Sequence, residues 1–445
     1  MNILNRKITF RLYPNATQSA ALDETLALHC RTYNALLEEH ARRYEAEEGS
    51  YTFTRMCADL TQWRASVDAL KSLNAQSLQV TAKRVALAFN AFFRRTAEGN
   101  TPGYPRFKSL NRFSGWGYKT YGDGWKLRTQ LSSTEFGYDR ISLTGIGDLK
   151  IRGKGRFVGS PKTCEIQHKH GKWYASVTFE VAEYRVARPT GNESAAFDWG
   201  INTLLTIAKG DGTLTEVDNP RWLKTKLNSI KTLQRVISAE EAKLRLCLGK
   251  AVDVKISHQE ESSKLKRLYR ELRNIHSKLA RQRKDFYHKL TTMLVERFAF
   301  LGTEELAVRN MTKAPKAKEN PDKPGDFLPN GAAAKAGLNR SILDAAPSML
   351  INMLKTKAEE AGSVFALANT RVLKPTQRCS QCGTLVPKVL SERVHRCTCG
   401  CNIGRDENAA KTILRWMFEG DFWKAGNQPG SASYLETPSI AAYAA

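Results

Sequence analysis

Five cysteines lie between residues 379 and 401, and the chain then runs directly into a predicted helix that begins near Asp406. A cysteine cluster usually ends a small module, whereas this one continues without a break into an acidic residue. Four thiolates around a tetrahedral zinc ion need two short turns brought together by a loop of about this size. A shell of four ligands has no open position, so the zinc is predicted to be structural.

The predicted zinc module spans residues 376–402. Four of five cysteines are expected to ligate the ion, the candidates being Cys379, Cys382, Cys397, Cys399 and Cys401. The first two form a CxxC pair, which is a strong metal signal. The second pair is irregular, because its spacing is CxC or CxxxC. Cys397 with either Cys399 or Cys401 would complete the shell, and His395 is a weaker substitute.

Two other uses of cysteine are less consistent with the sequence. The remaining cysteines are scattered singly and are interpreted as ordinary small buried residues. Clustered cysteines in an intracellular chain bind metal more often than they form disulfides. A redox role for the first CxxC pair lacks the strand–helix context that thioredoxin-like motifs have.

The charge balance indicates a polyanionic partner. The chain has 69 Lys and Arg against 44 Asp and Glu, a formal net charge of +25. Such an excess favours nucleic acid, because phosphate contacts release counterions, although charge does not separate RNA from DNA. A generally basic protein without such a partner is the alternative. The start lacks the apolar core of a signal peptide, and no apolar run is long enough for a membrane span. We therefore expect a cytoplasmic, nucleoid-associated protein of a prokaryotic cell; the sequence gives no indication of its oligomeric state.

The hydrophobic patterns predict alternating all-α, all-β and mixed parts. In chain order they give a strand at 8–14, helices between 18 and 95, short strands between 103 and 181, a strand at 195–197, a hairpin at 204–217, a helical pair at 221–297, a helix at 342–361 and a strand at 364–368. The second arm of the helical pair repeats apolar residues as an a/d seam, from Leu265 to Leu279. Residues 312–337 read as a mobile loop or lid, and the tail after Trp423 as disordered.

Three acidic residues far apart in the chain are the candidate catalytic groups. Asp198 ends an apolar strand, Glu304 ends another short apolar segment, and Asp406 stands where a helix begins. Converging carboxylates suit hard divalent cations such as Mg²⁺, or Mn²⁺, and two such ions could support phosphodiester hydrolysis. In the alternative interpretation Asp406 merely caps its helix.

Taken together, these motifs resemble the TnpB family of transposon-encoded, RNA-guided DNA endonucleases, which are related to compact type V CRISPR effectors. The matching features are the strand-borne Asp-x-Gly, Glu-x-Leu-x-Val, the CxxC cluster and Arg-Asp-x-Asn-Ala-Ala, in that order. GYPRFKS, RKDFYHKL and NRSILDA match as well, and the resemblance covers roughly residues 7–418.

The resemblance implies a split RuvC nuclease, an RNase H-like α/β domain, with Asp198, Glu304 and Asp406 as its acids. Glu305 is the fallback if the register slips by one, since Gly302-Thr303 interrupts the apolar strand. Arg405 and Asn408 match flanking positions and would support the site.

The implied architecture is α/β with all-β and all-α parts. Its domains are an OB-like wedge β-barrel (1–14 and 99–190), a helical recognition domain (15–98), the RuvC domain (191–375 and 403–423, with a helical insertion at 221–297 and a lid at 312–338), the zinc module (376–402) and a disordered tail (424–445).

Five residues are candidate nucleic-acid contacts: Gln79, Lys83, Arg106, Lys108 and Arg283. Gln79 matches a recognition-helix position and shares its face with Lys83, as candidates for base contact. An ordinary exposed helix residue is the alternative for Gln79. Arg106 and Lys108 are expected at phosphates, with Phe107 between them in the core.

The leading functional hypothesis is metal-dependent, RNA-guided cleavage of double-stranded DNA next to a short flanking motif. The guide RNA would be transcribed from the transposon end. A nuclease-inactive RNA-guided repressor, a compact CRISPR effector and a transposase that joins DNA ends are the alternatives. Relatives of the repressor type typically lose one or more of the acids, and all three are present here.

Overall fold

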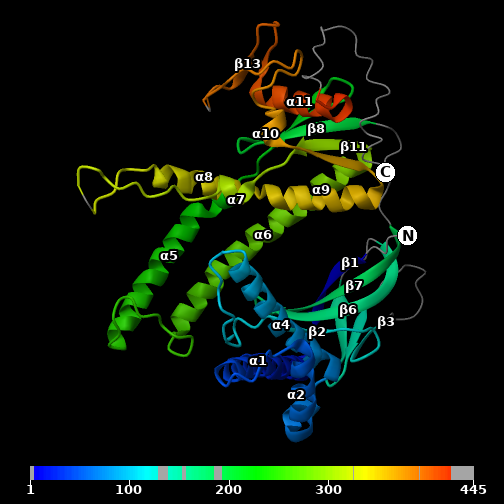
Figure 1. Ribbon diagram of the computed structural model, residues 1–445, viewed down its shortest axis with the longest axis vertical. Coiled ribbons are helices and arrows are strands. Elements are labelled where there is room, and N and C mark those ends of the chain that lie inside the picture. Colours follow the sequence, from blue (N-terminus) through cyan, green and yellow to red (C-terminus); the bar gives the residue numbers. More distant parts are fainter. Residues whose placement is uncertain are drawn as a thin grey trace. The chain divides into compact units, whose positions relative to one another are not determined.

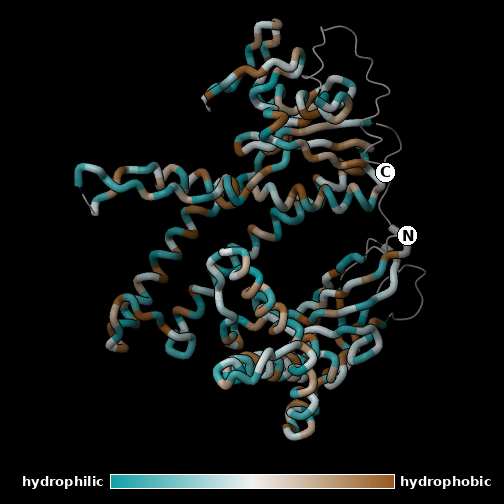
Figure 2. Tube along the Cα trace, in the orientation of Figure 1, coloured by the Kyte–Doolittle hydropathy of each residue, from teal (hydrophilic) through white to brown (hydrophobic). Residues whose placement is uncertain are grey.

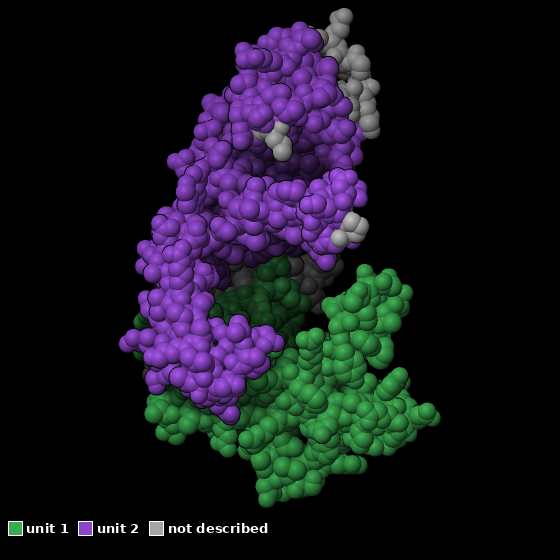
Figure 3. Space-filling model, turned by 90° about the vertical axis from the view of Figure 1, so that its left-hand side faces the viewer, with its two compact units in different colours: residues 1–185 green, residues 186–445 purple. Residues whose placement is uncertain are grey.

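The computed structural model describes residues 5–128, 139–152, 157–184, 193–323, 325–389 and 391–421. The predicted disordered tail at 424–445 lies outside them. The chain divides into two compact units, residues 1–185 and 186–445, which Figure 3 shows in separate colours. Each unit has its own hydrophobic core. No helix among the described residues is both long and apolar enough to cross a membrane.

The first unit contains an antiparallel sheet in the order β2-β6-β7-β1-β5-β4-β3. Its strands are β1 (Asn5–Tyr13), β2 (Gly115–Tyr118), β3 (Trp125–Arg128), β4 (Arg140–Leu143), β5 (Gly147–Arg152), β6 (Phe157–Lys169) and β7 (Lys172–Tyr184). Strand alternation buries Phe10 and Leu12 of β1 on one face. Within the described residues, β2 and β3 are the edges of an open sheet, so the predicted barrel closure is not seen there (Figure 1).

The helices of the first unit cover the apolar face of this sheet. They are α1 (Ala16–Glu45), α2 (Phe53–Ser66), the short α3 (Asp68–Lys71) and α4 (Ala75–Ala97). Asn15 starts α1 with a reciprocal capping box to Gln18. The predicted helical region is therefore confirmed, with a break between α1 and α2 that the apolar spacing did not reveal.

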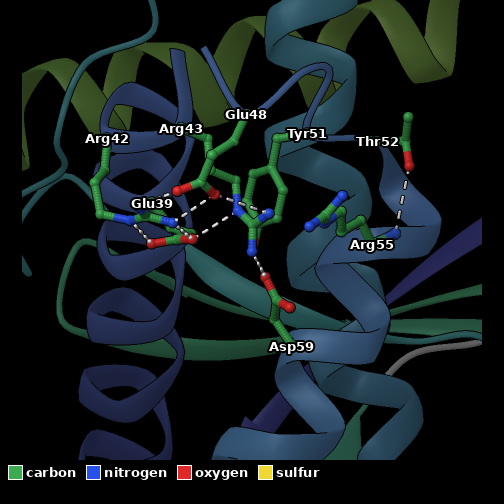
Figure 4. A network of polar contacts seen from close by, with 8 residues as sticks. All are labelled: Glu39, Arg42, Arg43, Glu48, Tyr51, Thr52, Arg55 and Asp59. Atoms are coloured by element: carbon green, nitrogen blue, oxygen red, sulfur yellow. Dashed lines mark hydrogen bonds and ion pairs between the residues drawn. The ribbon is translucent and has the colours of Figure 1, made fainter. Parts of the chain in front are cut away.

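A polar network fixes the turn between α1 and α2 (Figure 4). Glu39 accepts hydrogen bonds from Arg42 and Arg43, which lowers the pKa of Glu39 to about 2. Arg43 also reaches Asp59 on α2 at 3.3 Å, and the Tyr51 hydroxyl donates to the same carboxylate. Because Arg43 is largely buried, these pairs position α2 more firmly than exposed ion pairs would.

The second unit is built on a mixed sheet in the order β10-β9-β8-β11-β12. Its strands are β8 (Ser194–Trp199), β9 (Thr203–Lys209), β10 (Leu214–Asp218), β11 (Phe300–Glu304) and β12 (Val364–Ala368). Strands β8, β11 and β12 are mutually parallel, whereas β9 is antiparallel to both of its neighbours, β8 and β10. The sheet thus collects segments that long insertions separate in sequence, as predicted.

Helices cover both faces of this sheet. On one face α11 (Arg405–Glu419) packs Ala410 and Ile413 against Ala196 of β8. On the other face, Phe197 and Leu301 belong to the core formed with α6 (Ser263–Arg297) and α9 (Pro347–Ala361). Figure 1 shows α11 and α9 on opposite sides of the strands.

The predicted helical pair is confirmed as α5 (Trp222–Cys247) and α6. Apolar residues recur among polar ones along both helices (Figure 2). Leu265 and Leu268 of the predicted seam pack with Leu233 and Ile237 of α5. The pair is therefore a helical hairpin with its own small core.

The helix predicted at 342–361 is confirmed over residues 347–361, whereas residues 342–345 belong to a separate helix. The two helices are α8 (Ala332–Ala345) and α9, and Ala346 between them has a left-handed backbone with φ 42°. Pro347 then starts α9, where its missing N–H is not needed. Of the loop predicted at 312–337, residues 332–337 belong to α8. The short helix α7 (Val308–Met311) lies directly before this loop.

Candidate functional site

Asp198 and Glu304 lie at the carboxyl ends of neighbouring parallel strands. The pairing of β8 with β11 aligns Ala196 with Gly302, and two more residues along this register bring Asp198 beside Glu304. Residues two apart on a strand share a face, so both carboxylates lie on the face that α11 covers. Glu305 is exposed and alternation points it away from that face, so the structure favours Glu304 over the fallback.

Gly302 and Thr303 do not interrupt β11, contrary to the sequence interpretation. A Cβ on Gly302 would lie 2.1 Å from Sδ of Met417, so the missing side chain makes room for α11. Thr303 is buried, and its hydroxyl donates to the carbonyl of Phe197 at 2.9 Å. Both residues therefore tie β11 to its neighbours and fix the register of Glu304.

Asp406 stands in the first turn of α11, and it does not cap the helix. The N-cap is Gly404, and no side chain bonds to the free backbone amides there. Arg405 Nε instead donates to Asp406 Oδ1 at 3.2 Å. The alternative that Asp406 is merely a cap is therefore not supported, and its carboxylate is available to the site.

The pKa shift of Asp198 indicates that the three acids lie close together. Burial raises the pKa of Asp198 well above its usual range, and the nearby carboxylates of Glu304 and Asp406 raise it further, against an opposing effect of Arg405. Burial also raises the pKa of Glu304, against a hydrogen bond from Thr370. Converging carboxylates in this setting repel one another without a cation. The donor set is all oxygen, which fits Mg²⁺ or Mn²⁺.

The cysteine cluster forms a second candidate metal site. Sγ atoms of Cys379, Cys382, Cys397 and Cys399 all lie within 4.8 Å of one another. Two of their separations are 3.5 and 3.6 Å. A tetrahedral zinc with Zn–S bonds of ~2.3 Å has sulfur atoms about 3.8 Å apart, so the four thiols fit this ion. They could bind zinc.

Of the two alternatives for the fourth ligand, this geometry favours Cys399. Cys401 is buried and lies with His395 in a second group of potential ligands, which shares Cys379 with the first. Lys388 Nζ lies 2.7 Å from His395 Nδ1.

Asn408 connects the cysteine cluster to α11. It is fully buried; its Nδ2 donates to the carbonyls of Arg378 at 2.7 Å and Pro375 at 3.2 Å, and its Oδ1 accepts from Ser380 N. Thr412 adds a hydrogen bond to the Arg378 carbonyl. These hydrogen bonds therefore attach residues 375–380, which lead into the cysteine cluster, to α11, the helix that carries Asp406. Sequence reasoning named Asn408 as supporting but missed Thr412, since an ordinary helix threonine gives no signal.

Three of the candidate nucleic-acid contacts remain available on the surface of the first unit. Gln79 is partly buried on α4 and lines a small pocket with Arg64 and Lys71. Lys83 is exposed one turn later, with Nζ 5.0 Å from the ring centre of Phe53. Arg106 is exposed as well. These positions are consistent with nucleic-acid contacts, which stay predictions.

The structure differs from the sequence-based expectation at three residues, Lys108, Phe107 and Arg283. Lys108 has its Nζ 4.3 Å from the ring centre of Tyr33, and burial lowers its pKa, so it packs locally instead of projecting outward. Arg283 donates to Asp344 at 2.7 Å, and both side chains are largely buried. Phe107 is 63% exposed, so its predicted place in the core is wrong.

Family models match three parts of the chain. OrfB_IS605, described as "Probable transposase", matches residues 176–314, which carry Asp198 and Glu304. The model "Cas12f1-like, TNB domain" matches residues 348–413, which include the cysteine cluster and Asp406. A "Helix-turn-helix domain" model, HTH_OrfB_IS605, matches residues 1–49, where the structure has β1 and the single long helix α1.

Full-length relatives are similar over most of the chain. "Putative RNA-guided DNA endonuclease InsQ" of Escherichia coli (strain K12) is 29% identical and covers 91% of this chain and 90% of its own length. "Putative RNA-guided DNA endonuclease" of Streptomyces pristinaespiralis is 25% identical, covering 93% and 90%.

Two solved structures share the fold. One is the Cas12f1-sgRNA-target DNA complex, with a TM-score of 0.51 at 10% identity, covering 93% of this chain and 99% of the other. The other is the mini-RNA-guided endonuclease CRISPR-Cas_phi3, with a TM-score of 0.50 at 9% identity, covering 97% and 94%. The split sheet with a cysteine module joined to its last helix defines a compact type V-like fold. Together with the family matches, this shows that the chain is similar to OrfB_IS605 proteins and to Cas12f1-like proteins.

Proposed function

We propose that this chain is an RNA-guided DNA endonuclease of a mobile element. The observation that carries the proposal is the arrangement of Asp198 and Glu304 on neighbouring strand ends, with Asp406 in the first turn of the helix covering that face. Its relatives named as RNA-guided DNA endonucleases support the same activity. The reaction would be hydrolysis of a phosphodiester in a RuvC-type, RNase H-like site.

Asp198, Glu304 and Asp406 would hold two Mg²⁺ ions, or Mn²⁺. When bound, such ions activate a water molecule and stabilise the leaving oxygen. The chain itself contributes the positions of the three carboxylates, through the β8–β11 register and the packing of α11. Arg405 holds Asp406 from one side and offsets part of the negative charge.

The nucleic-acid partners would be a guide RNA, transcribed from the transposon end, and double-stranded target DNA. The net charge of +25 supports binding of this kind. Base pairing to the guide would read the target, while the protein reads a short flanking motif. In this proposal the sheet of the first unit is the wedge domain, its helices are the recognition domain, and residues 376–402 bind structural zinc. The protein would act in the prokaryotic cytoplasm, at the nucleoid.

The main alternative is an RNA-guided repressor without nuclease activity. Such a protein has no need for three carboxylates on one face of the sheet, where their mutual repulsion is a cost. The pKa of Asp198, raised by burial and by Glu304 and Asp406, therefore favours the nuclease.

The test is guided cleavage by the purified protein with its co-purified RNA. Asp198→Ala should abolish cleavage, by about 10³-fold or more, while guided DNA binding persists. Glu305→Gln is the matched control, because this neighbouring acid is exposed on the other side of the strand and should cleave normally. Sequencing the bound RNA should give one discrete species. Full activity of the Asp198 variant, or only random RNA fragments, would contradict the proposal.

A further inference from the structure

A pocket lined by basic residues lies just beyond the end of β8, apart from the carboxylates and the cysteines. Its volume is about 270 Å³. The turn after β8 supplies Asn202, the start of α5 supplies Arg221 and Lys224, and α8 supplies Arg340. Figure 1 shows the start of α5 close to α8. Three cations thus come from two separate elements to one small space.

The charge of this pocket is not balanced by the protein. Within the part of the chain that the structure describes, neither Lys224 nor Arg340 forms an ion pair, and Arg221 bonds only weakly to Asn202 Oδ1, at 3.4 Å. The acidic lining residue, Asp344, is already engaged: it accepts from Leu223 N at 2.8 Å and from Arg283 at 2.7 Å. Among the described residues, the three cations of this pocket therefore have no carboxylate as an ion-pair partner.

Two further features define the anion that would fit. The amino-terminal end of the 26-residue helix α5 adds a partial positive charge at the pocket. The volume lies below the roughly 300 Å³ at which drug-sized ligand pockets begin. A phosphate group suits both the size and the guanidinium and ammonium donors.

The distance between the pocket and Asp198 indicates which molecule would supply the phosphate. Asn202 lies four residues after Asp198, so their Cα atoms are at most about 14 Å apart, at ~3.6 Å per residue. Along one nucleic-acid strand the rise is ~3.4 Å per nucleotide, so this distance spans about four nucleotides. A strand whose scissile phosphate lies at the carboxylates can therefore reach the pocket.

We propose that Arg221, Lys224 and Arg340 form a phosphate subsite that grips the backbone of the DNA strand being cut, within about four nucleotides of the scissile bond. This inference rests on the proposed nuclease function. These residues would be positioning residues, since they hold the strand and do not touch the reacting atoms.

The experiment uses the full ribonucleoprotein and compares Lys224→Gln, Arg340→Gln and the double variant with wild type. Lys226→Gln is the control, because this exposed lysine lies on the same helix but does not line the pocket. Each pocket variant should slow guided cleavage about tenfold, the effect of losing one charge-assisted phosphate contact, whereas the control should not. Guide RNA affinity should stay unchanged.

A second readout identifies the phosphate. Substrates with one neutral methylphosphonate at successive positions should show one position near the cut where wild-type cleavage falls about tenfold. In the double variant that position should lose its effect. The inference is overturned if wild type cleaves but the pocket variants match it, if methylphosphonate sensitivity is identical in wild type and variant, or if only RNA affinity falls, which would assign the pocket to the guide. Absence of cleavage by wild type would instead refute the proposed function.

Discussion

Asp198 shows which properties of a site residue can be predicted from sequence and which depend on the structure. Its place at the end of an apolar strand and its match to a family motif were enough to select it from sequence, along with Glu304 and Asp406. Its burial and its electrostatic coupling to the other two acids needed the structure. Long-range partners explain the residues that sequence reasoning misjudged. Arg283 pairs with Asp344, 61 residues away, and nothing in its local sequence indicates that partner.

The raised pKa of Asp198 predicts how stability depends on pH. Without divalent cations, the folded protein keeps the Asp198 proton at pH values where the unfolded chain has lost it. The free energy of unfolding should therefore fall as pH rises from the unfolded pKa, ~3.9, to the higher folded one.

Asp198→Asn has no carboxylate to ionise, so at neutral pH it should melt at a higher temperature than magnesium-free wild type. Thermal denaturation across pH tests this, with the protein dialysed free of magnesium. Added Mg²⁺ should raise the melting temperature of wild type but leave the variant unchanged. Equal melting curves for both proteins at neutral pH would rule out a buried, strained carboxylate.

At the scale of elements, the close approach of α11 to β11 determines whether the site forms. From sequence alone, Gly302 is interpreted as interrupting the strand, because local propensity disfavours glycine in strands. Its function depends on Met417, more than a hundred residues later, and no local pattern encodes that contact. The break at Ala346 has a local signal that the apolar spacing overrode, because Pro347 inside a helical pattern ends the helix at the residue before it.

Gly302→Ala should force the buried Met417 side chain, or α11 with it, to shift, because the new Cβ would lie 2.1 Å from Met417 Sδ. Overpacking of this kind costs about 1–3 kcal/mol. Guided cleavage should fall together with the melting temperature. The double variant Gly302→Ala/Met417→Ala removes the clashing atoms and should recover part of both. If adding Met417→Ala lowered the melting temperature and guided cleavage further, the contact between residue 302 and Met417 would not be the cause of the defect.

The cysteine module permits a similar comparison between two neighbouring thiols. Cys399→Ser removes one member of the four-thiol group and should lower bound zinc from about one ion per chain to a small fraction. Cys401→Ser leaves that group intact and should retain the ion. Elemental analysis of the purified variants measures this, and equal zinc content in both would show that the fourth ligand is misassigned.

At the scale of the whole molecule, two units with separate cores share one strongly basic chain. Charge and family motifs together predicted the class of partner and the nuclease-type sheet. They could not predict which cations face a ligand, because Lys108 and Lys224 look alike in sequence and differ only in their tertiary surroundings.

RNA binding should depend steeply on salt. Raising monovalent salt from about 50 to 200 mM should weaken guide RNA affinity about 10³-fold, the value for roughly six phosphate contacts. A filter-binding titration measures the slope, and Asp198→Ala should give the same slope as wild type. An affinity that hardly changes with salt would exclude the phosphate backbone as the main contact.

The three acids come from β8, β11 and α11, so the last of them is synthesised more than two hundred residues after the first. A ribosome must pass Asp406 before any product can cut. A truncated or frameshifted product that ends before Asp406 would lack one carboxylate of the proposed site, so it should not cleave DNA.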